Sequence, residues 1–221
     1  MVFPRPIRAV VFDMDGLLVD TEVLIRELMI VAARARGADL PHDVFIRMVG
    51  LPNAASDAVA RAHFGPDFPM EAWDADVSAG AYAACEAGVA LKAGVRELLD
   101  LLDEREIPRG IATSSSHRAV IRTLTPSGIL GRFGIVVAAG DYARGKPDPD
   151  PYLMAAEKLG VDPCDCLALE DSHNGVRAAH AAGMMTVMVP DLLDPTEEMR
   201  GLTIAIAESL HHVRDLIQAQ A

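Results

Sequence analysis

Two aspartates, Asp13 and Asp15, stand two positions apart at the end of a largely apolar run, Ile7–Phe12, and Gly16 follows them. A carboxylate aimed at a phosphorus atom is a competent nucleophile, and it forms an aspartyl-phosphate that water then cleaves. A second carboxylate two residues on can protonate the leaving oxygen and later take a proton from that water. Because Asp-x-Asp-Gly stretches also form plain turns, the pair needs support from the rest of the chain.

Three further polar clusters follow short apolar runs: Thr113–Ser116, Gly145–Pro149 and Glu170–Ser172. Each has an ordinary explanation on its own, as a helix N-cap, a solvated lysine loop or a helix-dipole partner. Together with the aspartate pair, these clusters supply carboxylates, hydroxyls and the ammonium of Lys146. Crowded carboxylates favour a hard cation such as Mg²⁺, and Lys146 with the Thr113 hydroxyl can hold phosphate oxygens as charge shifts in the transition state. The four clusters in this order predict metal-assisted phosphoryl transfer.

The apolar runs before these clusters have the length and composition of strands that are buried on both faces of a parallel sheet. The predicted strands are Ile7–Phe12, Gly110–Ala112, Ile135–Ala138, Cys166–Leu169 and Thr186–Val189. The helical segments between and after them are Gly94–Arg105, a stretch after Ser116, Pro151–Leu159, Gly175–Ala182 and Leu210–Gln218. This alternation predicts an α/β fold, a doubly wound, Rossmann-like parallel sheet. Ligands bind such sheets at the carboxyl ends of the strands, so the four clusters should converge on one crevice.

The chain after the first strand departs from this alternation, because it holds helical patterns and no convincing strand. The predicted helices there are Thr21–Arg36, Asp43–Met48, Ser56–His63 and Glu71–Glu86. We expect a helical cap over residues 17–90 and an α/β catalytic core over residues 1–16 and 91–221. Glycine-containing linkers, Gly16–Val19 and Gly88–Gly94, would join the two parts. Trp73, Phe64 and Phe68 are expected to pack inside the cap.

Composition excludes several classes of protein. The 221 residues are 51% hydrophobic and only 5% aromatic, with a net charge of −12, which argues against a nucleic-acid partner. No apolar run approaches the roughly 20 residues of a membrane span. The charged, proline-containing start, Met1–Arg8, does not resemble a signal peptide. We therefore expect a cytoplasmic protein without a membrane partner, whose cysteines, Cys85, Cys164 and Cys166, are buried thiols.

The four motifs resemble those of the haloacid dehalogenase superfamily of phosphohydrolases. Phe12–Glu22, Gly145–Pro149 and Glu170–Gly175 are highly specific for the branch that contains phosphoglycolate phosphatase and β-phosphoglucomutase. The helical insertion after the first motif resembles the mobile cap of that branch, so the resemblance covers nearly the whole chain.

The resemblance implies a role for each motif residue. Asp13 is then the nucleophile and Asp15 the general acid and base. Mg²⁺ would be held by Asp13, the Asp15 carbonyl and Asp171, with Glu170 acting through water. Thr113 and Lys146 bind the phosphoryl group, and the substrate-binding set implied as a whole is Gly16, Thr113, Ser114, Lys146 and Asn174.

The activity that the resemblance implies is a Mg²⁺-dependent phosphatase of a small phosphorylated metabolite, a sugar phosphate or a phosphoglycolate-like molecule, acting as a monomer or homodimer. Dehalogenases of the superfamily lack the second aspartate, which is present here as Asp15. Phosphonate hydrolases use a cap lysine, and the sequence has none between Gly16 and Gly88. A non-catalytic binding protein with the same fold is also conceivable, but no motif position has been lost.

A sugar-phosphate mutase of the β-phosphoglucomutase type is the main alternative. Such a mutase needs cap groups that bind a second phosphate, and an apolar side chain cannot hold a phosphate dianion. The positions that match its cap groups by count are Ile25, Val49 and Asn53, and Ser116 replaces a lysine after the second motif. These residues favour the phosphatase, although Arg26 and Arg47 stand close by in the sequence.

Overall fold

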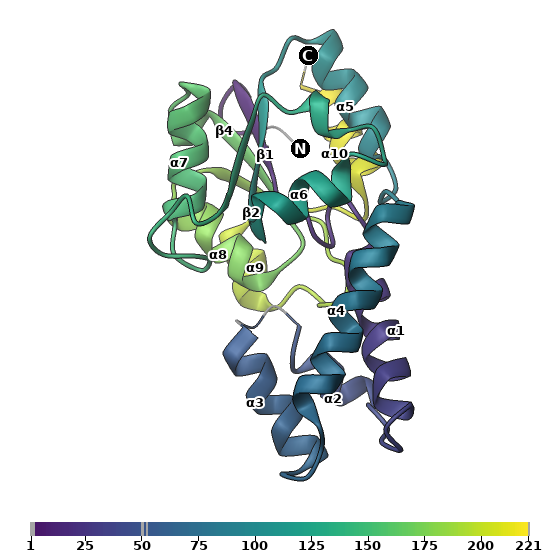
Figure 1. Cartoon of the computed structure of the whole chain (residues 1–221). Coiled ribbons are helices and arrows are strands. Elements are labelled where there is room, and N and C mark those ends of the chain that lie inside the picture. The colour runs from purple at the N-terminus through teal and green to yellow at the C-terminus, as the bar shows by residue number, and fades with distance from the viewer. Residues whose placement is uncertain (1–2, 50, 52, 221) are drawn as a thin grey trace.

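The computed structural model of the chain describes residues 3–49, 51 and 53–220. Within this part of the chain the core is a six-stranded parallel sheet with the order β3-β2-β1-β4-β5-β6 (Figure 1). The strands are β1 (Ala9–Phe12), β2 (Arg109–Ser116), β3 (Ile135–Ala139), β4 (Cys166–Glu170), β5 (Met185–Met188) and β6 (Ala205–Ile206). The predicted α/β fold with a doubly wound parallel sheet is confirmed.

Both faces of the sheet are buried. In β1, Val10 and Phe12 belong to one apolar cluster and Ala9 and Val11 to another, since successive side chains of a strand point to opposite faces. The first cluster packs beneath α5 (Val95–Glu104), α6 (His117–Leu124) and α10 (Leu210–Gln218). The second packs beneath α7 (Asp150–Leu159) and α8 (His173–Ala181), while α9 (Glu197–Leu202) lies against α8. Short 3₁₀ turns occupy Leu130–Arg132 and Pro163–Asp165.

Several boundaries differ from the sequence-based prediction. β2 does not end at Ala112 but continues to Ser116, which pairs with Ala139 beyond a shift in register. β6 and α9 were not predicted, because two and six residues are too short to show a period. The expectation of a buried thiol was wrong for Cys164, which is partly exposed and accepts a hydrogen bond from Arg5; the other two cysteines are buried.

A helical insertion (residues 21–87) separates β1 from α5 in the sequence and projects from the sheet, as Figure 1 shows. It consists of α1 (Thr21–Arg34), α2 (His42–Ile46), α3 (Asn53–Phe64) and α4 (Met70–Ala87). The insertion has an apolar cluster of its own. Buried Trp73 donates its indole N–H to the Met29 carbonyl at 3.0 Å, and Phe64 stacks on Phe68 with centroids 4.1 Å apart, as expected. Among the described helices none is both long enough and apolar enough to cross a membrane.

The two linkers that join the insertion to the sheet lie side by side. The Asp20 amide donates to the Ala90 carbonyl at 3.0 Å, and the Lys92 amide donates to the Leu18 carbonyl at 3.1 Å. The Lys92 ammonium lies 2.6 Å from Asp191, which follows β5. The chain thus leaves and re-enters the sheet at neighbouring points, next to the carboxyl end of β1.

Candidate active site

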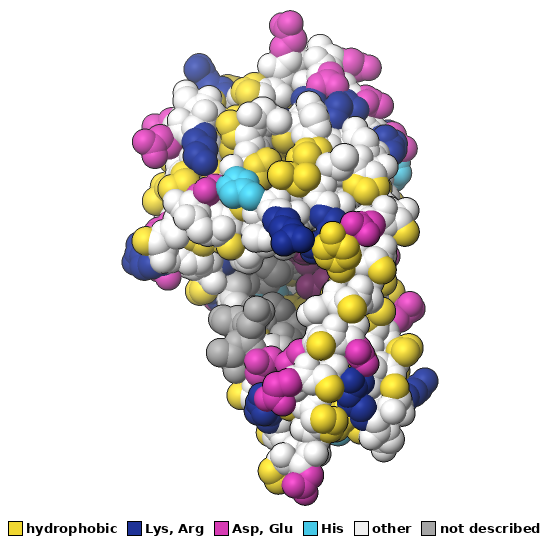
Figure 2. Space-filling model, viewed as in Figure 1, with side chains coloured by type: hydrophobic (Ala, Val, Ile, Leu, Met, Phe, Trp, Pro, Cys, Tyr) yellow, Lys and Arg dark blue, Asp and Glu magenta, His cyan; other side chains and the backbone are white. Residues whose placement is uncertain are grey.

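The four predicted clusters meet at the carboxyl edge of the sheet. β1 lies between β2 and β4, so the chain switches direction there, and such a switch point leaves a crevice for ligands. A cavity of about 390 Å³ opens at this edge, and Figure 2 shows a hollow between the sheet and the helical insertion. The predicted site residues that line the cavity are Asp13, Asp15, Thr113, Ser114, Lys146, Asp171 and Asn174. Glu170 lies buried beneath it, and Gly16 lines a neighbouring cavity.

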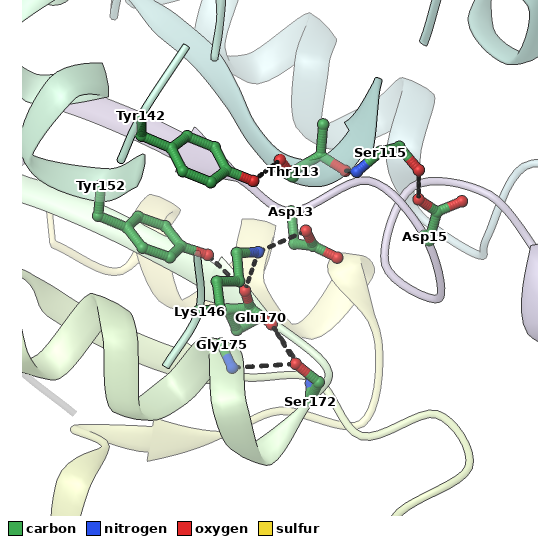
Figure 3. Close-up of polar contacts among 10 residues, drawn as sticks. All are labelled: Asp13, Asp15, Thr113, Ser115, Tyr142, Lys146, Tyr152, Glu170, Ser172 and Gly175. Carbon is green, nitrogen blue, oxygen red and sulfur yellow. Dashed lines mark hydrogen bonds and ion pairs between the residues drawn. The ribbon is translucent and has the colours of Figure 1, made fainter. Parts of the chain in front are cut away.

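Lys146 is the buried cation of this crevice. Its ammonium lies 2.6 Å from Asp13 Oδ1 and 2.5 Å from Glu170 Oε1 (Figure 3), and its side chain is only 7% exposed. Burial acts to lower the pKa of Lys146, but the charges of Asp13 and Glu170 outweigh burial and raise that pKa above its ordinary value. The side chain therefore stays cationic beside Asp13, where it can attract phosphate oxygens.

Glu170 is fixed by donors on both carboxylate oxygens. Besides Lys146, the Tyr152 hydroxyl donates to Oε1 at 2.5 Å. The Ser172 amide and hydroxyl donate to Oε2 at 3.3 and 3.1 Å. The Gly175 amide in turn donates to the Ser172 hydroxyl at 3.1 Å (Figure 3). Since a Cβ on Gly175 would lie 1.9 Å from the Glu170 carboxyl carbon, any larger residue at this position would force the Glu170 carboxylate to move.

Gly175→Ala is expected to lower kcat by about 100-fold, because the methyl group displaces Glu170 and with it Lys146, and small misplacements near reacting groups have effects of this size. Steady-state phosphate release would measure it. Gly201→Ala in α9 is the matched control, since a Cβ there meets nothing within 4 Å. Equal activity of the two variants would show that the Glu170 position does not matter for turnover.

Asp15 is held between the sheet and the insertion. Thr21, the first residue of α1, donates its hydroxyl to Asp15 Oδ1 at 2.9 Å, and Ser115 of β2 donates to Oδ2 at 2.7 Å. The carboxylate thus lines both the crevice and the cavity that extends into the insertion. Thr113 lies deeper: its hydroxyl accepts from the Ser115 amide at 3.0 Å, and its carbonyl accepts from the Tyr142 hydroxyl at 3.0 Å.

Three carboxylates could hold a metal ion. Oxygens of Asp13, Glu170 and Asp171 lie within 4.8 Å of one another, and the Asp15 side chain is not among them. Burial and the neighbouring carboxylates raise the pKa of Asp171 well above its ordinary value, and burial above all raises that of Asp13 to about 7. Asp171 Oδ1 is buried without a hydrogen-bond partner among the described residues. An all-oxygen set with an orphaned carboxylate oxygen fits a hard divalent cation, which would relieve the repulsion.

Gly16 allows Asp171 to come this close. Its φ of +80° is in the left-handed region, and a Cβ would lie 2.4 Å from Asp171 Oδ2. Gly16 is therefore needed for the close approach of Asp171, in addition to its predicted role in binding substrate. The sequence did not reveal this requirement.

Glu22 is a third carboxyl with a raised pKa, and it also lines the crevice. Burial first, and then the charges of Asp191 and Asp15, raise its pKa from 4.5 to about 7. Since the folded protein holds this proton more tightly than the unfolded chain does, the folded state loses stability as the pH rises from 4.5 to about 7.

Glu22→Gln is accordingly expected to stabilise the protein by about 2 kcal/mol near pH 8 and to have no such effect near pH 4. Thermal unfolding at the two pH values would measure the difference. Glu27→Gln, on the exposed face of the same helix, is the control. A stability gain that is equal at both pH values would contradict a perturbed Glu22.

Several residues that shape the site were given no individual role in the sequence-based prediction. Thr21, Ser115 and Ser172 lie inside or next to the motifs, but a hydroxyl leaves no periodic signal, and its partner is known only from the fold. Tyr152 has the spacing of an ordinary core residue of α7, and it is fully buried. A hydroxyl on a core-facing helical position, which requires a polar partner, is the one sequence signal that could have identified it.

The model of the haloacid dehalogenase-like hydrolase family matches residues 7–183. Hexitol phosphatase B of Escherichia coli strain K12 is 35% identical over 196 residues, which cover 86% of each chain. The chain belongs to the haloacid dehalogenase-like hydrolases. Together with its phosphatase relatives, this membership identifies it as a phosphoric monoester hydrolase.

Solved structures agree with this family. A Thermotoga maritima protein that carries the provisional name β-phosphoglucomutase superposes with a TM-score of 0.82 at 27% identity, covering 97% of this chain and all of the other. CbbY from Rhodobacter sphaeroides, in complex with phosphate, has a TM-score of 0.78 at 26% identity, and 94% of this chain and 96% of that chain are covered.

Proposed function

We propose that the protein is a Mg²⁺-dependent phosphatase of small phosphorylated metabolites and that it works through an aspartyl-phosphate on Asp13. The observation that carries the proposal is the position of Asp13, at the base of the crevice with Lys146 at 2.6 Å and Asp171 within the same carboxylate cluster. A carboxylate placed in this way can attack phosphorus while a fixed cation holds the phosphoryl oxygens.

Each residue at the edge of the crevice has one task in this reaction. Asp13 attacks phosphorus, and Asp15 protonates the leaving oxygen. Asp15 then takes a proton from the water that cleaves the aspartyl-phosphate. Lys146 and the Thr113 hydroxyl hold the phosphoryl oxygens throughout. Thr21 and Ser115 keep the Asp15 carboxylate facing the leaving group.

Mg²⁺ would be held by Asp13, the Asp15 carbonyl and Asp171, with Glu170 contributing through water. The ion supplies positive charge that neutralises the crowded carboxylates and the incoming phosphate. Ser114 and Asn174, which line the cavity, would contact substrate, and Gly16 would allow the backbone to approach it.

The helical insertion would act as a cap, with residues 17–90 as the cap and residues 1–16 and 91–221 as the catalytic core. Leu51 supports this arrangement, because it belongs to the insertion and lines the crevice together with Asp13. Closure of such a cap excludes bulk water from the reacting groups.

Among the described residues, the crevice and the cavity beside it offer no Lys, Arg or His other than Lys146 to hold the second phosphate that the mutase alternative needs. Ile25 and Val49 belong to the apolar part of the lining of a cavity beside the crevice, and Arg26 and Arg47 do not line either cavity. Ser116 caps α6 by accepting from the Ala119 amide at 3.3 Å. The Asn53 side chain lies outside the described residues.

Phosphate release from a panel of phosphorylated sugars, glycolate and nucleotides, with and without Mg²⁺, tests the proposal. We expect metal-dependent release of inorganic phosphate from one or more sugar or small-alcohol phosphates. Interconversion of β-glucose 1-phosphate and glucose 6-phosphate, primed by the bisphosphate and with little free phosphate, would establish the mutase instead.

A further inference from the structure

A second cavity of about 310 Å³ opens from the crevice into the helical insertion. The two cavities share Asp15, Glu22 and Leu51. Most of the remaining lining of the second cavity is apolar and comes from α1, α2 and the residues just after α2: Ile25, Met29, Phe45, Met48 and Val49. We call this space the cap cavity. Its size is at the lower end of the range for small-molecule sites.

The cap cavity lies where a leaving group must go. The inference rests on the proposed function, in which the phosphoryl group sits between Asp13 and Lys146 and Asp15 protonates the leaving oxygen. Since Asp15 lines both cavities, the carbon skeleton attached to that oxygen extends past Asp15 into the cap cavity.

The cap cavity offers no positive charge to such a skeleton. None of the described residues that line it is Lys, Arg or His, and the sequence of residues 50–54, Gly-Leu-Pro-Asn-Ala, carries no charge. The nearby lysines are engaged elsewhere: Lys146 lies between Asp13 and Glu170, and Lys92 lies 2.6 Å from Asp191. A second anionic group would lose its hydration here without gaining a counter-charge.

Above about pH 7, where Glu22 is ionised, its side chain adds a repulsive charge at the boundary of the two cavities. Glu22 is in the first turn of α1, where the helix dipole favours a negative charge. Its own carboxylate takes this place, so the place is not open to an anionic group of the substrate. A carboxylate accepts hydrogen bonds from hydroxyl groups and repels carboxylates and phosphates at short range.

The geometry points to a leaving group that bears hydroxyls and no second anion, and to Glu22 as the residue that selects it. Hydroxyls of the substrate donate hydrogen bonds to Glu22. The C–H faces of the substrate pack on Ile25, Phe45 and Val49. Phosphate monoesters of uncharged polyols and sugars are then substrates, whereas phosphoglycolate, phosphorylated sugar acids and bisphosphates are rejected.

Matched pairs of substrates test this selection on the 221-residue protein with Mg²⁺ at pH 8, where Glu22 is ionised. The first pair is 2-hydroxyethyl phosphate and phosphoglycolate, and the second is glucitol 6-phosphate and 6-phosphogluconate. Within a pair the principal change is the replacement of an uncharged oxygen function by a carboxylate. In the pair whose size suits the cavity, we expect kcat/KM for the uncharged member to be at least about tenfold higher than for the anionic member. The reason is that the carboxylate of the anionic member would lie close to the carboxylate of Glu22, and close like charges are strongly unfavourable.

Variants assign the selection to the cap cavity. Glu22→Gln is expected to reduce the uncharged-to-anionic ratio of kcat/KM by about tenfold. Glu27→Gln, in the same helix but exposed, should leave the ratio unchanged. Val49→Lys adds a cation to the opposite side of the cavity and should also lower the ratio, by raising kcat/KM for the anionic member. It thus provides an independent test if Glu22→Gln does not fold.

Hydrolysis of p-nitrophenyl phosphate separates this inference from the proposed function. If that ester is cleaved but the anionic member of both pairs is preferred, the selection is contradicted and the phosphatase stands. If the wild-type ratio is high but neither Glu22→Gln nor Val49→Lys changes it, the cap cavity does not bind the leaving group. If no phosphate ester is cleaved, the proposed function fails, and this inference fails with it.

Discussion

Asp13→Asn is expected to reduce phosphate release by about 10⁴-fold or more, the scale seen when a catalytic nucleophile is removed. An amide has no anionic oxygen to attack phosphorus, so the first chemical step is lost. The fold should persist, because the Asp13 amide still donates to the Leu169 carbonyl and asparagine has nearly the same shape. Phosphate release with p-nitrophenyl phosphate and thermal unfolding would measure the two effects separately.

Asp67→Asn is the matched control for this substitution, since Asp67 is exposed in the helical insertion and far in sequence from every motif. It should retain wild-type turnover. Appreciable activity in a homogeneous Asp13→Asn preparation would mean that another group attacks phosphorus.

Removal of divalent metal is expected to lower kcat by about 10³-fold, because a bound cation contributes several kcal/mol to phosphoryl transfer. The structural reason is the cluster of Asp13, Glu170 and Asp171, whose oxygens lie within 4.8 Å of one another in a buried site. Chelation followed by addition of Mg²⁺ should abolish and then restore activity.

Asp171→Ala should raise the Mg²⁺ concentration for half-maximal activity by about 100-fold, since loss of a group near a metal reduces affinity on this scale. Asp67→Ala should leave that concentration unchanged. Full activity in metal-free buffer, or an unchanged Mg²⁺ requirement in Asp171→Ala, would contradict the proposed metal site.

The sheet was predictable because its strands are buried on both faces. Runs such as Val10–Phe12 and Leu167–Leu169 are continuous and apolar. The polar motif that follows each run marks the carboxyl end of the strand. The helical insertion was predictable for a similar reason, since its cluster around Trp73 requires helical spacing. Strand β6 pairs through only two residues, and a segment of that length has no detectable pattern.

Contacts between distant residues could not be predicted in this way. The sequence places Lys146 in a proline-containing loop, where a lysine is ordinarily solvated, yet the fold buries it against Asp13, 133 positions away. Tyr152 supports Glu170 from a helix that otherwise packs as core. The charge of the cap cavity likewise depends on which side chains α1 and α2 turn toward Asp15, which is a property of packing and not of spacing.

The central claim, that Asp13 becomes phosphorylated during turnover, is tested most directly by rapid acid quench followed by peptide mass mapping. During turnover of p-nitrophenyl phosphate with Mg²⁺, we predict an acid-stable phosphoryl group on the peptide that contains Asp13. The group should form at least as fast as the enzyme turns over, and it should disappear when the substrate is exhausted. A pre-steady-state burst of p-nitrophenol with that peptide unmodified at every quench time, in a preparation where a synthetic acyl phosphate survives the same handling, would contradict it.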